Sequence, residues 1–157
     1  MNQTQANHSA SPQKVDPFGG LDLTAIARDT QAARVILRAV NLALHAEETG
    51  SISRTDSAGA SRWSAAISAA MDRLDSVRDA LMESSGASQI DWFTSHALVS
   101  ALDCALWDGY CTSAKTLTHE EIIAFTQVTI DALDGMLREC DAAAGAVAAV
   151  SCVGNMQ

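Results

Sequence analysis

Apolar residues recur at alternating spacings of three and four over three long segments of the chain. This spacing places them in a stripe along one side of an α-helix. The three stripes are Leu23, Ile26, Thr30, Ala33, Leu37, Val40 and Leu44; Trp63, Ile67, Ala70, Leu74, Val77 and Leu81; and Ile123, Thr126, Ile130, Leu133, Leu137, Cys140, Ala144 and Val147. A helix with one apolar stripe must bury it against other elements, and three or four such helices can do so together as a bundle.

Cap residues and breakers set the expected ends of the first two helices. The first helix is expected over 23–48, with Asp22 as its N-cap and Gly50 as its stop. A linker of small polar residues is expected at 51–59, and the second helix at about 60–83.

Capping signals open the last two helices. Residues 88–91 resemble a capping box, from which a third helix is expected to run from near Ile90 to about Tyr110. At 118–121, Thr118 is expected to cap the fourth helix while Glu121 reaches back to it. That helix is expected to reach about 141 and then either to continue to 150 or to fray.

The third helix carries apolar residues on most of its sides. One face is marked by Ile90, Phe93, Ala97, Cys104 and Trp107, and extended by Leu98, Ala101, Leu102 and Ala105. Its only charged residues are Asp91, Asp103 and Asp108. We therefore expect this helix to be the most buried of the four.

Long helices with short connections favour antiparallel neighbours, so the sequence predicts an all-α, up-down four-helix bundle. The bundle domain is expected to span residues 21–150. Residues 1–20 are rich in Asn, Gln, Ser and Pro without a core pattern, which predicts a flexible N-terminal tail. Residues 151–157 are expected to form a flexible C-terminus.

Charge and composition narrow the classes of partner. The formal net charge of −9 disfavours nucleic acid, because an acidic chain repels a phosphate backbone. Residues 1–13 lack a basic start and an apolar run, so we expect no secretory signal. The longest nearly uncharged stretch, 142–156, is expected to be too short and too weakly apolar to span a bilayer. We therefore expect a soluble cytoplasmic protein without a membrane partner, with nonclassical export left open. The four cysteines form no Cys-x-x-Cys, and we expect them to be reduced, buried small hydrophobes.

His96 is the first candidate for chemistry. The string Ser95-His96-Ala97-Leu98 resembles the helical His-x-Leu segment of histidine phosphotransfer domains, and the resemblance implies a phosphoacceptor role for His96. In that family a lysine and a glycine follow the leucine to hold the phosphoryl charge and to clear space for it. Val99 and Ser100 stand there in this chain, so the resemblance is degenerate.

His96, Asp103 and Cys104 together form a candidate ligand set on the third helix. His96 and Asp103 are seven residues apart, which is about 10 Å along a helix, so a metal or small-ligand site there needs further ligands from another helix. Glu-x-x-His, glycine-rich phosphate loops, Gly-x-Ser-x-Gly and His-Glu-x-x-His are all absent. We therefore expect no metal, no cofactor and no enzymatic activity.

Most aromatic residues gather in the third helix, namely Trp92, Phe93, Trp107 and Tyr110. They cannot all face one core, so they either touch neighbours on two sides or form a patch for a partner or a second subunit. We take Trp92, Trp107 and Tyr110 as the candidate interaction surface. The leading hypothesis is a regulator, adaptor or oligomer that acts by protein–protein contact, and the alternative is a ligand-binding, metal-binding or phosphotransfer-like bundle centred on His96.

The chain is alanine-rich, has more arginine than lysine, and opens its last helix with Leu-Thr-His-Glu-Glu-Ile at 117–122. In these features it is similar to small uncharacterised α-helical proteins of proteobacteria, among them Burkholderia hypothetical proteins studied as antigens. The resemblance implies a bacterial protein and transfers no catalytic residue.

Overall fold

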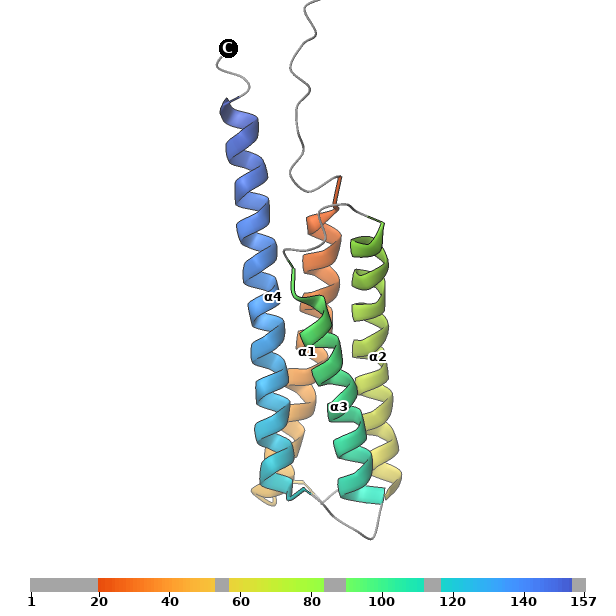
Figure 1. The fold of residues 1–157 in the computed structure, drawn as a ribbon. Coiled ribbons are helices and arrows are strands. Elements are labelled where there is room, and N and C mark those ends of the chain that lie inside the picture. Colours follow the sequence, from red (N-terminus) through yellow and green to blue (C-terminus); the bar gives the residue numbers. More distant parts are fainter. Residues whose placement is uncertain (1–19, 53–56, 84–89, 112–116, 154–157) are drawn as a thin grey trace, which may run out of the picture.

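The computed structural model describes residues 20–52, 57–83, 90–111 and 117–153, with the backbone alone at 57–62, 108–111 and 150–153. These residues form four α-helices, shown in Figure 1. The helices are α1 (Leu23–Glu48), α2 (Ser57–Met82), α3 (Trp92–Cys111) and α4 (His119–Val153). The prediction of an all-α fold with four helices is confirmed. The flexible tail predicted at 1–20 lies outside the described residues except for Gly20.

Consecutive helices run in opposite directions in Figure 1, and each helix lies beside two others: α1 and α3 both contact α2 and α4. Contacts between α1 and α4 agree with this direction. Arg34 pairs with Asp134, whereas Asn41, farther along α1, donates to the carbonyl oxygen of Ile123, earlier on α4 (3.2 Å). Residue numbers therefore rise on α1 as they fall on α4, which is the register of antiparallel neighbours.

The ends of α1 follow from its cap residues. The Asp22 carboxylate accepts a hydrogen bond from the Ala25 amide at 2.9 Å, as an N-cap does. At the other end Gly50 has φ +70°, and the Ser51 amide donates back to the Ala46 carbonyl at 2.9 Å. A left-handed residue followed by this backward bond is a Schellman motif, which glycine forms without a steric cost.

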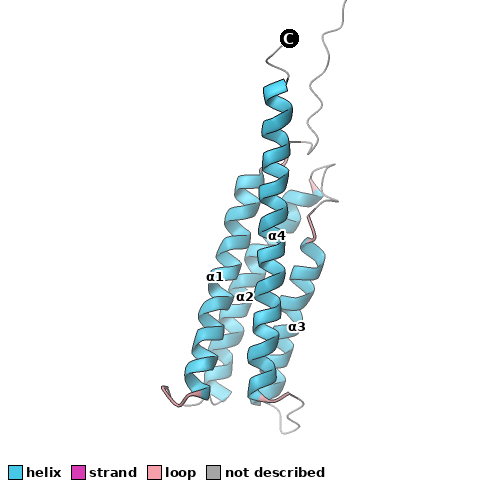
Figure 2. Ribbon diagram, turned by 90° about the vertical axis from the view of Figure 1, so that its left-hand side faces the viewer, coloured by secondary structure: helices cyan, strands magenta, loops and turns pink. Residues whose placement is uncertain are grey.

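The capping box of α4 is also confirmed. The Thr118 amide donates to Glu121 Oε2 (2.7 Å), and the Glu121 amide donates to Thr118 Oγ1 (3.2 Å). The helix then continues to Val153, three residues past the predicted domain end at 150. Figures 1 and 2 show the C-terminal part of α4 extending beyond the ends of the other helices.

Two predicted boundaries are corrected. Helix α2 begins at Ser57, inside the linker predicted at 51–59. Helix α3 begins at Trp92, and its N-cap is Asp91, whose carboxylate accepts from the Thr94 amide at 3.1 Å. Residues 84–89 lie outside the described residues, so of the capping box predicted at 88–91 only its last part can be placed.

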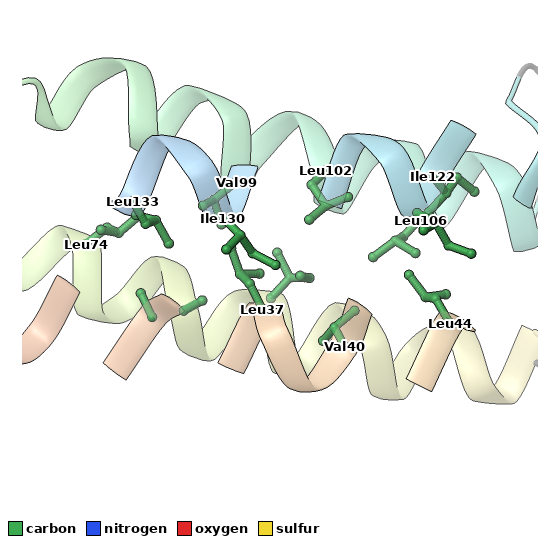
Figure 3. Packing of buried hydrophobic residues seen from close by; sticks show 14 residues of the cluster. Leu37, Val40, Leu44, Leu74, Val99, Leu102, Leu106, Ile122, Ile130 and Leu133 are labelled. Carbon is green, nitrogen blue, oxygen red and sulfur yellow. The ribbon is translucent and has the colours of Figure 1, made fainter. Parts of the chain in front are cut away.

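The core lies along the axis between the four helices, and all four contribute to it (Figure 3). The predicted stripes of α1 and α2 are buried, apart from the half-buried Leu23 and Trp63 at their ends. The predicted stripe of α4 is buried or half-buried as far as Cys140. Ala144, its next member, is exposed.

Helix α3 presents a different face to the core from the one predicted. Its buried residues are Ser95, Val99, Leu102, Ala105 and Leu106. Four of the five residues predicted to mark the core face are exposed: Phe93, Ala97, Cys104 and Trp107. The fifth, Ile90, is buried, and so are Leu102 and Ala105 of the predicted extension. The expectation that α3 is the most buried helix fails because of the four exposed residues.

Candidate functional site

Five exposed apolar residues share the solvent side of α3 with the half-buried Ser100, and we call the five the outer stripe: Phe93, Ala97, Ala101, Cys104 and Trp107. Their spacings of four, four, three and three keep them on one side of the helix. The stripe is about 21 Å long, because an α-helix rises about 1.5 Å per residue. Phe93 is 74% exposed and Trp107 is 53% exposed, so large aromatic rings stand in solvent at both ends.

The outer stripe holds no charged residue, although the chain carries a formal charge of −9. Single exposed apolar side chains are common on protein surfaces, whereas a contiguous strip with aromatic ends is typical of a contact surface. The side chain of Tyr110, predicted as part of this surface, lies outside the described residues.

Trp92 belongs to the bundle more than to the stripe. It is half-buried, and its indole Nε1 donates to the Leu74 carbonyl of α2 at 2.6 Å. Its ring lies 4.8 Å from the ring of His96 and 6.4 Å, edge to face, from the ring of Phe93. Trp92 therefore joins α3 to α2, and its ring contacts the ring of Phe93.

The polar residues of α3 face α2. His96 Nε2 lies 3.4 Å from Asp75 Oδ1, and Ser64 Oγ donates to Asp103 Oδ1 at 2.9 Å. These contacts place His96 and Asp103 along the seam between the two helices, each with its own partner. Cys104, the third member of the predicted ligand set, lies instead on the outer stripe.

The structure does not bring the three predicted ligands together as a metal site. Among the residues that the structure describes, no group of three or more His, Cys, Asp or Glu is arranged to hold a metal ion. The neighbouring Asp75 also restricts His96 as a phosphoacceptor, because a carboxylate beside Nε2 repels an incoming phosphoryl group.

Asp75 shares one side of α2 with two exposed aspartates at spacings of three and four, and we call the three the acidic lip: Asp72, Asp75 and Asp79. Asp75 meets α3 through His96. Arg78 lies between two of the aspartates, 3.1 Å from Asp75 and 2.9 Å from Asp79. Its hydrogen bond with Asp79 and the charges of both carboxylates raise the pKa of the guanidinium above its ordinary value, so Arg78 remains a cation at every relevant pH.

Sequence reasoning missed Phe93 and the acidic lip as parts of the candidate site. The signal for Phe93 was present in the spacing from 93 to 107, but the same spacing was interpreted as a core face. The acidic lip could not be found from sequence spacing, because only the packing of α3 against α2 places Asp75 beside His96 and so near the ring of Trp92.

An acidic hollow at the opposite end of the bundle from the α3 N-terminus is lined by Glu47, Glu48, Thr118, His119 and Glu120. His119 Nε2 lies 2.9 Å from the carbonyl oxygen of Leu44, which ties the start of α4 to the end of α1. The hollow is wide open and forms no enclosed pocket. The contact of His119 with Leu44 at this hollow therefore joins the ends of two helices.

None of the described helices combines the length and the apolar character that a membrane crossing requires. Comparison of the chain with protein families, with curated proteins and with solved structures gave no match. The resemblance to small proteobacterial helical proteins therefore stays a prediction, and the outer stripe with its acidic lip is the feature from which function can be argued.

Proposed function

We propose that this protein is a non-enzymatic helical bundle that acts through protein–protein contact, as a regulator or adaptor, with the outer stripe of α3 as its contact surface. The exposure of Phe93 and Trp107 at the two ends of an uncharged stripe carries the proposal. Tryptophan and other aromatic residues supply much of the binding energy of protein interfaces, because they bury a large apolar area with few rotatable bonds.

The bundle does not need these side chains for its own packing. The core side of α3 is complete with Val99, Leu102 and Leu106, which are at most 1% exposed. Exposed aromatic rings gain free energy only when another surface covers them, at roughly 25 cal/mol per Å² of apolar area. A partner on the outer stripe would supply that cover.

The alternative function centred on His96 has less support from the contacts. A phosphoacceptor or metal ligand needs a free imidazole nitrogen in an open site. Here Nε2 faces Asp75, and the ring lies against Trp92. Both contacts suit a histidine that helps to join α3 to α2.

Site-specific photocrosslinking in the native cell tests the proposal. A photoreactive amino acid replaces Ala97, in the middle of the outer stripe, and in a matched variant replaces Leu42, which is 69% exposed on α1. We expect crosslinked adducts from position 97 and not from position 42. The adducts should disappear when Phe93→Ser and Trp107→Ser are added, while the helical circular dichroism stays the same.

Equal adducts from positions 97 and 42, or adducts from 97 that survive both serine substitutions, would contradict a contact surface on α3. Light scattering of the purified chain belongs to the same test. It distinguishes an adduct with another protein from an adduct between two copies of this chain.

A further inference from the structure

This inference rests on the proposed function and concerns the kind of partner that the surface fits. The outer stripe and the acidic lip meet near the start of α3. Asp75 of the lip reaches the α3 ring of His96 at 3.4 Å, and Phe93 of the stripe is joined to that ring through Trp92. A surface that covers the stripe from the α2 side therefore also meets the lip.

The charge of this side is strongly negative. Among the described side chains of α2 and α3, four carboxylates belong to it: Asp72, Asp75, Asp79 and Asp103. Arg78 is the cation among them, because Arg73 turns away to Asp29 of α1, at 3.3 Å. Arg78 neutralises only part of the lip, so a partner at this side meets an apolar strip bordered by excess negative charge.

The shape of the stripe fits a helix. Small residues, Ala97 and Ala101, lie between the aromatic ends Phe93 and Trp107, so the stripe is low in the middle and raised at both ends. Small side chains let a second helix approach closely, and apolar residues at every third or fourth position of that helix can contact a strip of this kind. A length of about 21 Å corresponds to about four helical turns of the partner.

We propose that the α2–α3 side of this protein binds a basic amphipathic helix of another protein. The apolar face of that helix covers the outer stripe, and its lysine or arginine residues reach the acidic lip. Opposite charges on the two surfaces speed the encounter and set the orientation of the bound helix.

A second copy of the chain fits this side less well. It would bring a second acidic lip of the same sign to the contact, within a chain that carries −9 in total. Like charges at this range oppose each other over about a Debye length, which is about 8 Å at physiological ionic strength. The charge of the lip therefore selects a basic partner over self-association.

Binding of synthetic peptides to the full chain, followed by fluorescence anisotropy, tests the proposal. The probe is an 18-residue helical peptide, about five turns, with leucine at every third or fourth position and lysine on its flanks. One matched peptide has glutamate in place of lysine, and another has the same leucine and lysine residues in an order that spreads leucine around the helix. We expect the amphipathic lysine peptide to bind at least about tenfold more tightly than either control.

Protein variants separate the proposed site from general attraction to an acidic protein. The paired change Phe93→Ser with Trp107→Ser should weaken binding of the lysine peptide about tenfold or more. Val35→Ser with Leu42→Ser, an exposed apolar pair on α1, should leave binding unchanged. Asp72→Asn with Asp79→Asn should weaken it by about threefold, and more at low salt, whereas Glu48→Gln with Glu120→Gln at the opposite end should not.

The inference is overturned if the lysine peptide binds no better than the glutamate peptide, or if the two apolar pairs of serine substitutions weaken it equally. It is also overturned if light scattering shows a dimer that Trp107→Ser dissociates, because the occupant is then a second copy. In those cases crosslinking from position 97 can still succeed, and the proposed function stands. Failure of crosslinking at position 97 removes the proposed function itself.

Discussion

Helices α1 and α3 lie on opposite corners of the bundle, and they differ in how their sequences select a buried side. The stripe predicted for α1, from Leu23 to Leu44, is buried apart from its half-buried first residue. Of the face predicted for α3, Phe93, Ala97, Cys104 and Trp107 point to solvent, whereas Ile90, Leu102 and Ala105 are buried. Both helices contain enough apolar residues to face a core, so the amount of apolar surface does not explain the difference.

The distribution of charge explains it. Helix α1 carries Arg28, Arg34 and Arg38 away from its stripe, so turning the stripe outward would bring these arginines toward the core at a large cost. The charge that α1 does bury at Asp29 is paired with Arg73 of α2. Between 92 and 107, α3 carries one charged residue, Asp103. Its rotation is therefore set by neighbours, which satisfy Asp103 with Ser64 and Trp92 with the Leu74 carbonyl on α2. A helix that is apolar on most sides leaves its orientation to tertiary contacts.

Among these predictions, the largest change in the free energy of unfolding is expected from truncating buried side chains of α1 and α3, compared with exposed side chains of the same helices. Leu37→Ala on α1 and Leu102→Ala on α3 should each lower the free energy of unfolding by about 2–5 kcal/mol, because both residues are fully buried. Leu42→Ala and Phe93→Ala should change it by about 0.5 kcal/mol or less. Urea denaturation measures all four, and a cost for Phe93→Ala equal to that for Leu102→Ala would reverse the assigned faces of α3.

Cysteine reactivity extends the comparison to two thiols, Cys104 and Cys140, which were both expected to be buried from the sequence. Cys104 is exposed on α3, so its expected burial is wrong, whereas Cys140 of α4 is buried as predicted. Burial raises the pKa of the Cys140 thiol to about 11, and the charges of Asp141 and Glu139 add to the shift. At pH 8 only about one Cys140 in a thousand is then a thiolate.

With Cys111→Ser and Cys152→Ser in place, iodoacetamide should label Cys104 at least a hundredfold faster than Cys140 at pH 8. The rate at Cys140 should rise about tenfold per pH unit below its pKa. The same shift affects stability, because the pKa of Cys140 is higher in the folded state than its ordinary value of 9.0. The contribution of this thiol to the free energy of unfolding is therefore fully present below pH 9 and is lost as pH rises toward 11. Equal labelling rates in the folded protein would mean that Cys140 is not in the core.

Two tryptophans of α3 should respond differently to the same change. Trp92→Phe removes the 2.6 Å hydrogen bond to the Leu74 carbonyl, and should lower the free energy of unfolding by about 1 kcal/mol. Trp107→Phe removes no bonded group that the structure shows and should be close to neutral for folding. Thermal or urea unfolding compares the two, and equal costs would show that Trp92 does not anchor α3.

The smallest expected effect is at the start of α4, where sequence and structure agree. The backbone hydrogen bond from Thr118, followed by the bond from its hydroxyl, holds the pKa of Glu121 below its ordinary value of 4.5. The contribution of the Glu121 carboxylate to the free energy of unfolding is therefore present above pH 4.5, and it is lost as pH falls through the lower pKa of the folded state. An NMR titration should find this lowered pKa, and Thr118→Val should bring it closer to 4.5; an unchanged value in that variant would exclude the hydroxyl as a cause.

The sequence predicted which helix carries the candidate contact surface, but not which of its aromatic side chains point to solvent. The concentration of aromatic residues on α3 was predicted to mark an interaction surface, and Trp107 lies on the outer stripe. Trp92 was assigned to that surface although its indole N–H is used inside the bundle. Sequence spacing cannot distinguish these two tryptophans, because their difference lies in which neighbour offers a free carbonyl at hydrogen-bond distance.

The sequence by itself determined the helices, the caps of α1 and α4, and the buried sides of α1, α2 and α4. These depend on residues within a few positions of one another, or on an apolar spacing that marks one side of a helix. Tertiary structure decided the orientation of α3 and its contacts with α2, which pair Asp103 with Ser64 and His96 with Asp75. The second of these contacts also brings the acidic lip close to the outer stripe. Each of these depends on contacts between residues far apart in the chain, and for α3 the local pattern favours two faces almost equally.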